Sequence, residues 1–125
     1  MGEYIINEKF KSMSVKGIFK MLLDFCRNKP TYCTLSGNKS HKISEILDDR
    51  IKVERLGDGI KVERLKRPTD TPILTFDEIK EVIGLLKKDK IINTNSNEYK
   101  ELLAKPVNKT PLLSLLKASN IIVDY

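Results

Sequence analysis

Three side chains in this sequence are of the types that bind zinc: Cys26, Cys33 and His41. Their spacing is C-x6-C-x7-H, whereas zinc sites usually place two cysteines about two to four residues apart, so that both thiolates reach one ion. Cys26 falls on the apolar side of a predicted helix, where a free cysteine packs as a small hydrophobic residue. We therefore predict no metal site and no cofactor. With no secretion signal evident, we expect two free thiols.

His41 is the only histidine of the chain. General acid–base catalysis by a histidine needs a nucleophile or an orienting partner beside it. Ser36, Ser40 and Cys33 are close in sequence, but strand alternation gives no reason for their side chains to meet at His41. We expect His41 to be a partly exposed strand residue, and we predict no catalytic residue. The stretch 36–40 also lacks the G-x4-G-K-[ST] spacing of a phosphate-binding loop and is predicted to be a hairpin turn.

Acidic residues could serve a metal-dependent nuclease if they converged on one or two ions. Asp48, Asp49 and Asp58 are the candidates near the predicted sheet, but they fall in turns at opposite ends of one strand. Aspartate is a common turn residue, so turn formation explains all three without catalysis. We lean against an enzyme, and a small nuclease remains the weaker alternative function.

Basic residues give a stronger signal, because the net charge is +6 and its distribution is uneven. Residues 1–70 hold 15 Lys and Arg against 10 Asp and Glu, and all five arginines lie there. A basic surface attracts phosphate backbones or acidic protein faces. Acidic residues are interleaved with the basic ones, and Tyr32 is the one aromatic in the predicted sheet that could stack on a base. The predicted phosphate contacts are Arg55, Lys61, Arg64, Lys66 and Arg67.

Arg55, Lys61 and Arg64 belong to a repeated hexapeptide, Ile-Lys-Val-Glu-Arg-Leu, at 51–56 and 60–65, and Lys66 and Arg67 directly follow its second copy. Alternating apolar residues on both sides of Gly57-Asp58-Gly59 predict a β-hairpin. We place Asp58-Gly59 as a two-residue loop, because this register keeps the apolar residues on one face. Gly57 then pairs with Ile60 and Arg55 with Val62. A two-stranded ribbon of this kind can enter the major groove of DNA.

The elements around the hairpin follow from the change in hydrophobic period. Ser14 is predicted to cap a helix over 15–27, which ends before Pro30. Strands over 32–35 and 40–47 precede the hairpin and complete a four-stranded antiparallel meander. Residues 4–6 are expected to form either an edge strand or irregular chain on the core.

The period becomes helical after the linker-like stretch 67–72. Thr75 and Glu78 form a predicted capping box for a helix reaching about residue 88. A short helix is expected over 97–104 and a final one over 111–118, with Asn120 as its left-handed stop. Residues 121–123 are expected to form a strand or an apolar tail.

We thus predict a single α+β domain over 1–125, with an N-terminal helix, a four-stranded antiparallel β-meander and two to three C-terminal helices. The β-rich part covers about 1–67 and the helical part about 73–125. We predict a cytoplasmic, non-enzymatic binding protein that contacts nucleic-acid phosphates through the basic β-hairpin, with no membrane segment. The alternative is a protein–protein adaptor or inhibitor subunit of a bacterial or viral assembly, using a sheet edge or the helix around Leu112–Leu116.

Overall fold

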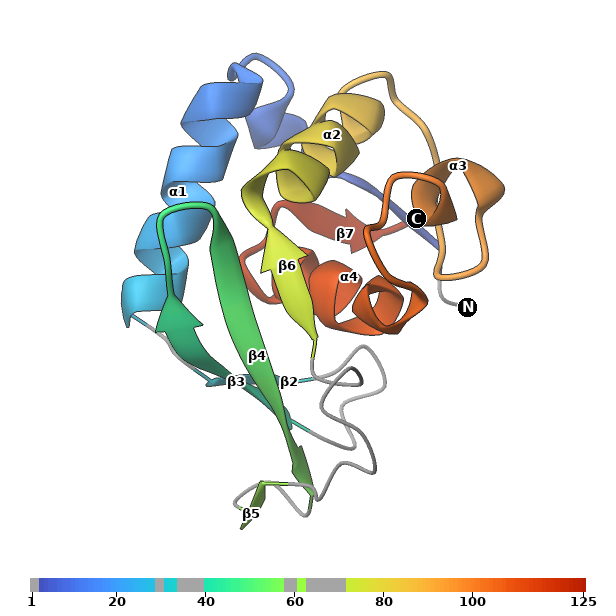
Figure 1. Cartoon of the computed structure of the whole chain (residues 1–125). Coiled ribbons are helices and arrows are strands. Elements are labelled where there is room, and N and C mark those ends of the chain that lie inside the picture. Colours follow the sequence, from blue (N-terminus) through green and yellow to red (C-terminus); the bar gives the residue numbers. More distant parts are fainter. Residues whose placement is uncertain (1–2, 29–30, 34–39, 58–60, 63–71) are drawn as a thin grey trace.

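The computed structural model describes residues 3–28, 31–33, 40–57, 61–62 and 72–125 (Figure 1). The elements, in chain order, are β1 (Tyr4–Ile6), the 3₁₀ helix η1 (Glu8–Phe10), α1 (Val15–Asn28), β2 (Thr31–Cys33), β3 (Ser40–Ile46), β4 (Arg50–Gly57), β5 (Lys61–Val62), β6 (Ile73–Thr75), α2 (Phe76–Leu86), α3 (Asn97–Lys100), the 3₁₀ helix η3 (Pro106–Asn108), α4 (Lys109–Ala118) and β7 (Ile122–Asp124). The mixed α+β class is confirmed. The predicted order is wrong at its start, because a strand and not a helix begins the described chain.

Helix α1 forms where its cap and its apolar spacing predict it. The Ser14 hydroxyl accepts a hydrogen bond from the Gly17 amide at 3.0 Å, which satisfies one of the free amides of the first turn. Ile18, Leu22 and Cys26 recur at helical spacing and are almost fully buried. Residues from this stripe join one core with residues from the sheet and from the other helices.

The predicted meander is present, as strands β2, β3, β4 and β5 pair antiparallel in that order. A further strand, β6, pairs with the first half of β4, with Ile51 opposite Leu74. The Val53 amide extends this contact by donating to the Pro72 carbonyl at 3.1 Å. The sequence does not indicate β6, because this strand has only three residues directly after a linker-like stretch, too few for an alternating pattern to show.

A β-bulge interrupts β3 between Ile43 and Glu45. His41 and Ile43 are buried, and strict alternation would next bury Glu45. The extra residue, Ser44, shifts the register so that Ile46 pairs with the buried Ile51. The Ser44 hydroxyl donates to the Lys52 carbonyl at 3.2 Å across the bulge. The bulge therefore keeps the apolar residues of β3 on the core side and leaves Glu45 exposed.

Helix α2 begins with the predicted capping box. The Glu78 amide donates to the Thr75 hydroxyl at 3.2 Å, and the Glu78 carboxylate accepts from the Thr75 amide at 2.9 Å. The same carboxylate, only 3% exposed, also accepts from Asn108 Nδ2 at 3.0 Å and from the Ala104 amide at 3.4 Å. Asn108 Nδ2 donates further to the Ile73 carbonyl at 2.8 Å. This buried network joins β6, α2 and the segment between α3 and α4.

Helix α4 is a core helix. Leu112, Leu113, Leu115 and Leu116 have no exposed surface. The prediction that the helix around Leu112–Leu116 could be a contact surface for a partner is therefore wrong. Asn120 ends this region in the left-handed conformation, with φ of 64°, as predicted.

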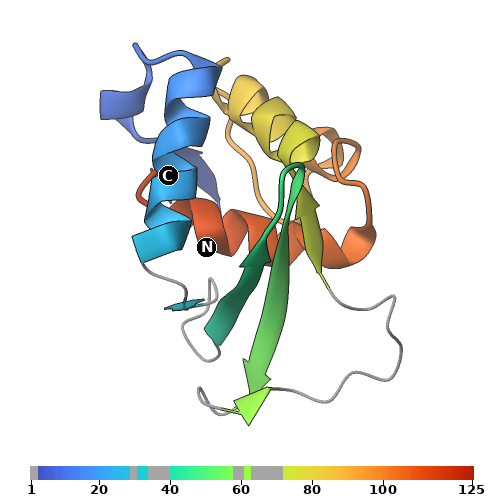
Figure 2. The ribbon, with the colours of Figure 1, turned by 60° about the vertical axis from the view of Figure 1, so that its left-hand side comes forward.

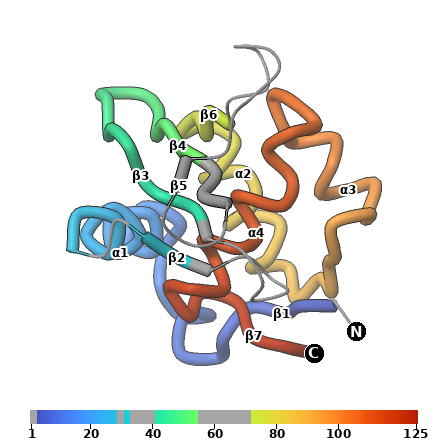
Figure 3. The backbone as a smooth tube through the Cα atoms, turned by 90° about the horizontal axis from the view of Figure 1, so that it is seen from below, coloured from blue at the N-terminus to red at the C-terminus, as the bar shows by residue number. Residues whose placement is uncertain are grey.

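The two ends of the chain pair with each other. β1 and β7 run antiparallel, with Ile6 opposite Ile122, and lie side by side in Figure 3. Tyr4 also exchanges two backbone hydrogen bonds with Ile92, at 2.8 and 2.9 Å. Both terminal segments are therefore strands, and their pairing brings the first and the last described elements to one side of α4.

The long sheet extends beyond the helices. α1 and α2 lie at the end of the sheet where β3 turns into β4, whereas the end of β4 with β5 projects away from them (Figures 1 and 2). This projecting end contains the described part of the predicted hairpin.

Candidate nucleic-acid interface

The hairpin is present, but its predicted register is wrong. Gly57 pairs with Lys61 and Leu56 with Val62, so the connection contains three residues, 58–60, instead of two. Val62 consequently lies opposite Leu56 and not opposite Arg55. The repeat made the two-residue loop attractive because it aligned the apolar positions of both copies. The body of the sheet already contains β6 along the first half of β4, so the second copy is not needed to continue the apolar face there.

The predicted phosphate contacts are only partly within the described residues. Arg55 lies in β4 opposite His41, and Lys61 lies in β5 opposite Gly57, both at the projecting end. Arg64, Lys66 and Arg67 lie outside the described residues. The structure therefore brings the strand positions of Arg55 and Lys61 together and does not test the other three.

Net charge differs between two neighbouring parts of the sequence that contain β3, β4 and β5. The part beside the helices, residues 42–54, contains three basic and four acidic residues, a net charge of −1. Residues 55–67, which we call the hairpin segment, contain five basic and two acidic residues, a net charge of +3. Nearer the helices, the Lys52 ammonium lies 3.5 Å from the Glu45 carboxylate, and Lys42 occupies the strand position opposite Glu54. The excess of positive charge in this part of the sequence therefore falls in the hairpin segment.

The turn between β3 and β4 does not have the geometry of a nuclease site. Both carboxylate oxygens of Asp49 accept hydrogen bonds from the Arg50 guanidinium, at 2.9 Å each. These hydrogen bonds hold the pKa of Asp49 below its usual range. Asp48 and Asp49 are exposed, and Asp58 lies outside the described residues. Among the residues that the structure describes, no group of three or more His, Cys, Asp or Glu side chains could hold a metal ion.

His41 is a core residue, contrary to the prediction of partial exposure. Its side chain is 3% exposed, and its ring lies 5.3 Å from the ring of Tyr32. Tyr32 is also buried, and its hydroxyl donates to the Pro111 carbonyl at 3.0 Å. Burial raises the pKa of Tyr32 well above its usual value. The one sheet aromatic considered for base stacking therefore faces the core and not a nucleic-acid strand.

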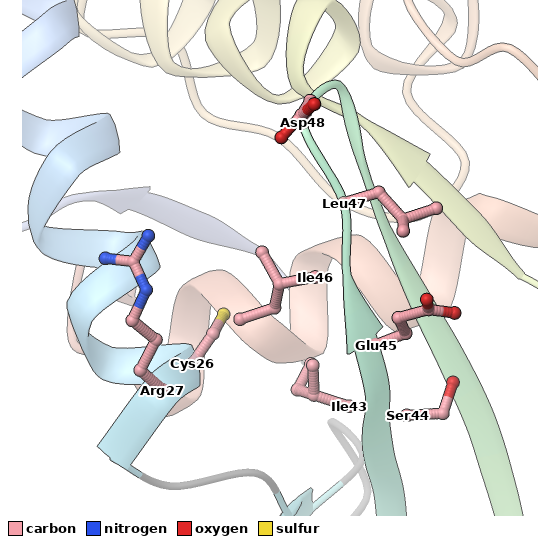
Figure 4. A pocket seen from close by; sticks show the side chains of 8 residues that line it. All are labelled: Cys26, Arg27, Ile43, Ser44, Glu45, Ile46, Leu47 and Asp48. Carbon is pink, nitrogen blue, oxygen red and sulfur yellow. The ribbon is translucent and has the colours of Figure 1, made fainter.

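A cleft of about 430 Å³ lies between the end of α1 and β3 (Figure 4). Cys26, Ile43 and Ile46 form its apolar side, and Arg27 and Asp48 lie at its edge. Cys26 is a free thiol, and burial raises its pKa to about 12. Such a thiol stays protonated at neutral pH and is a poor nucleophile. The cleft therefore provides no activated cysteine.

A second groove, between α2 and α3, went unnoticed in the sequence. It has a volume of about 420 Å³, and Glu81, Glu98 and Glu101 are among its lining residues. In the sequence these glutamates belong to ordinary exposed helix faces, and only the packing of α3 beside α2 brings them together.

No helix within the described residues is both long and apolar enough to cross a membrane. Comparison of the chain with models of protein families, with curated proteins and with solved structures finds no match.

Proposed function

We propose that this protein binds nucleic acid without catalysing a reaction. The projecting end of the β4–β5 ribbon contacts the phosphate backbone of the nucleic acid. The observation that carries the proposal is a difference in net charge along the sequence: the hairpin segment has a net charge of +3, and residues 42–54, which precede it, have a net charge of −1. Phosphate contacts made by Lys and Arg release counterions and supply most of the affinity in non-specific binding.

The geometry of the ribbon supports this proposal. β4 and β5 extend beyond α1 and α2, so the described end of the hairpin can approach a duplex without a clash from these helices (Figure 2). A two-stranded ribbon is narrow enough for the major groove of B-DNA. The proposed contacts are Arg55, Lys61, Arg64, Lys66 and Arg67. Since the sheet aromatic is buried, affinity should depend on phosphate contacts and little on base stacking.

A salt titration of the full chain with mixed-sequence duplex and single-stranded DNA tests the proposal. We expect binding at ~50 mM salt that weakens steeply as salt increases, and an Arg64→Ala/Arg67→Ala variant whose log–log slope is shallower by about two units. The matched control is Lys16→Ala/Lys20→Ala, which removes the same charge from exposed positions of α1. Circular dichroism and thermal unfolding establish that each variant is folded.

Two results would contradict the proposal. One is the lack of any detectable binding by the wild-type chain at ~50 mM salt. The other is an equal loss of affinity in the α1 control and in the hairpin variant, which would mean that the overall charge of the protein, and not the hairpin, attracts the DNA.

A further inference from the structure

The groove between α2 and α3 has an apolar floor. Helix α2 buries Ile79, Val82, Ile83 and Leu86 in the core. Residues 81, 84, 85 and 88 recur with the same i, i+3, i+4, i+7 spacing and line the groove. Gly84 and Leu85 from this second stripe, with Leu102 after α3, are half-buried and form the floor.

The rim of this groove is acidic although the protein is basic. Glu81, Glu98 and Glu101 line it, against one lysine, Lys88. All four side chains belong to exposed residues. Glu98 also lies 3.7 Å from Lys90, but an exposed pair of this kind is weak and leaves the carboxylate available. The C-terminal half of α2 adds the partial negative charge of its last carbonyl groups.

The glycine at position 84 leaves the floor of the groove open. Glycine in the interior of a helix is less favourable than alanine, so its presence in α2 needs a packing reason or a functional one. A Cβ atom built at Gly84 would meet nothing within 4 Å. No neighbour within the described structure therefore requires a glycine at this position. The absence of a Cβ keeps the floor of the groove open for an approaching group.

We propose that the α2–α3 groove binds a short amphipathic segment of a partner protein, in which a leucine-sized side chain is flanked by lysine or arginine. The apolar side chain lies on Gly84, Leu85 and Leu102, and the flanking cations approach the three glutamates. The acidic rim in a protein of net charge +6 favours a basic partner and disfavours nucleic acid. None of the lining residues is fully buried, so the groove is too open to enclose a small molecule as ligand sites do.

The groove also lies away from the hairpin. α2 and α3 are in the upper half of Figure 1, whereas β5 is at its lower end, and Figure 2 shows the same separation. The chain could therefore bind a basic protein segment and a nucleic acid at the same time.

The probe is a synthetic amphipathic peptide with leucines at i, i+3 and i+4 and lysines elsewhere. It is titrated into the isotopically labelled full chain, and backbone amide signals are followed by NMR. We expect saturable shifts at Gly84, Leu85 and Leu102. A peptide with the leucines replaced by serine, and one with the lysines replaced by glutamate, should each bind at least about tenfold more weakly.

A Gly84→Leu variant fills the floor of the groove, and its open surroundings give no reason for misfolding. We expect at least about a tenfold loss of affinity for the leucine–lysine peptide, with unchanged binding to DNA. Glu98→Gln/Glu101→Gln should lower the affinity for the leucine–lysine peptide. The matched pair Glu8→Gln/Glu54→Gln lies outside the groove and should leave this affinity unchanged.

Wild-type affinity in the Gly84→Leu variant would overturn the proposal. Equal binding of the serine peptide would also overturn it, because overall charge would then suffice. The proposal would also be overturned if the wild-type chain formed concentration-dependent dimers and Gly84→Leu, alone among the variants, prevented them. The groove would then bind a second copy of this chain and not a partner protein. Loss of DNA binding in all proteins tested would leave the peptide result standing, because the two sites share no residue.

Discussion

The hairpin segment and the α2–α3 groove have opposite charge and are positioned in opposite ways. The hairpin segment has a net charge of +3 in thirteen consecutive residues, and its charge is visible in the sequence. The groove takes Glu81 from one helix and Glu98 and Glu101 from another region, and it exists only because the chain folds back. Local strand pairing extends the hairpin away from the core, whereas the core itself supports the groove. Changes in the core should therefore affect the groove more than the hairpin.

The largest effect is expected from Glu78, whose buried carboxylate near the start of α2 accepts from four donors. Glu78→Ala removes the acceptor of the half-buried Thr75 amide and hydroxyl and of one N–H of the buried Asn108, and it should lower the free energy of unfolding by roughly 2–4 kcal/mol. Chemical denaturation measures this change. Glu81→Ala, on the exposed side of the same helix, should change it by less than about 0.5 kcal/mol. At temperatures well below its unfolding transition, the Glu78→Ala variant should bind the leucine–lysine peptide more weakly and DNA as tightly as the wild type. Weaker DNA binding with unchanged peptide binding would contradict the idea that the core supports the groove more than the hairpin.

Charge reversal in the two regions gives the next largest effect. Arg64→Glu/Arg67→Glu should weaken DNA binding at ~50 mM salt on the order of 100-fold. Glu98→Lys/Glu101→Lys changes the net charge by the same amount in the opposite direction, but it should raise DNA affinity by no more than a few-fold. Fluorescence anisotropy with a labelled duplex measures both. Effects of equal size would show that net charge controls the affinity and that the hairpin has no special role.

Alkaline pH should destabilise the core, which supports the groove. Burial raises the pKa of Cys26 from 9.0 to about 12, so above pH 9 the folded state binds more protons than the unfolded state. The free energy of unfolding is therefore unaffected by the ionisation of this thiol below pH 9. It decreases as the pH rises from 9 towards 12, and the loss is about 2 kcal/mol at pH 10.5. Thermal unfolding measures the loss. Tyr32 and Tyr99, whose pKa values burial also raises, add losses above pH 10.

Cys26→Ala should flatten the first part of this decrease, between pH 9 and 10, where the tyrosines still contribute little. An identical pH profile in the wild-type chain and in Cys26→Ala would show that the thiol is not as buried as the structure places it.

The smallest effect compares two helical glycines. Gly84→Ala should raise the free energy of unfolding by about 0.5–1 kcal/mol, because the new methyl group meets nothing within 4 Å. Gly17→Ala should gain less, because its Cβ would lie 3.3 Å from the Ser14 hydroxyl that caps α1. Denaturant titration of both variants tests the difference. An equal gain in the free energy of unfolding at both positions would contradict the inference that the surroundings of Gly84 are more open than those of Gly17.

Local patterns predicted the elements well where cap and period agree. Ser14, the Thr75–Glu78 capping box and Asn120 all act as their sequence positions indicate, because each forms hydrogen bonds or a backbone conformation within a few residues. The hairpin itself was predicted for the same reason. Its register was not, because a difference of one residue in the loop changes the pairing of every strand residue and the repeat fits several alignments.

Long-range pairing was harder to predict. β6 follows a linker-like stretch, and β1 and β7 are three residues long, so none contains enough residues to show a strand period. The bulge at Ser44 breaks the period of β3 after Ile43, and the burial of His41 depends on Tyr32 and the core that pack around it. In each case the partner strand or the core supplies the stabilisation, and neither is adjacent in sequence.

The sequence by itself determined the mixed helix and strand content, the capped helix starts and the concentration of positive charge in residues 55–67, since these depend on neighbouring residues. Only the tertiary structure decided that the end of β4 with β5 projects from the helices (Figure 1), that the Leu112–Leu116 helix is buried and that a groove with an apolar floor and an acidic rim lies between α2 and α3. Burial and the meeting of distant side chains depend on which elements pack together. That packing is set by the whole core and not by any local pattern.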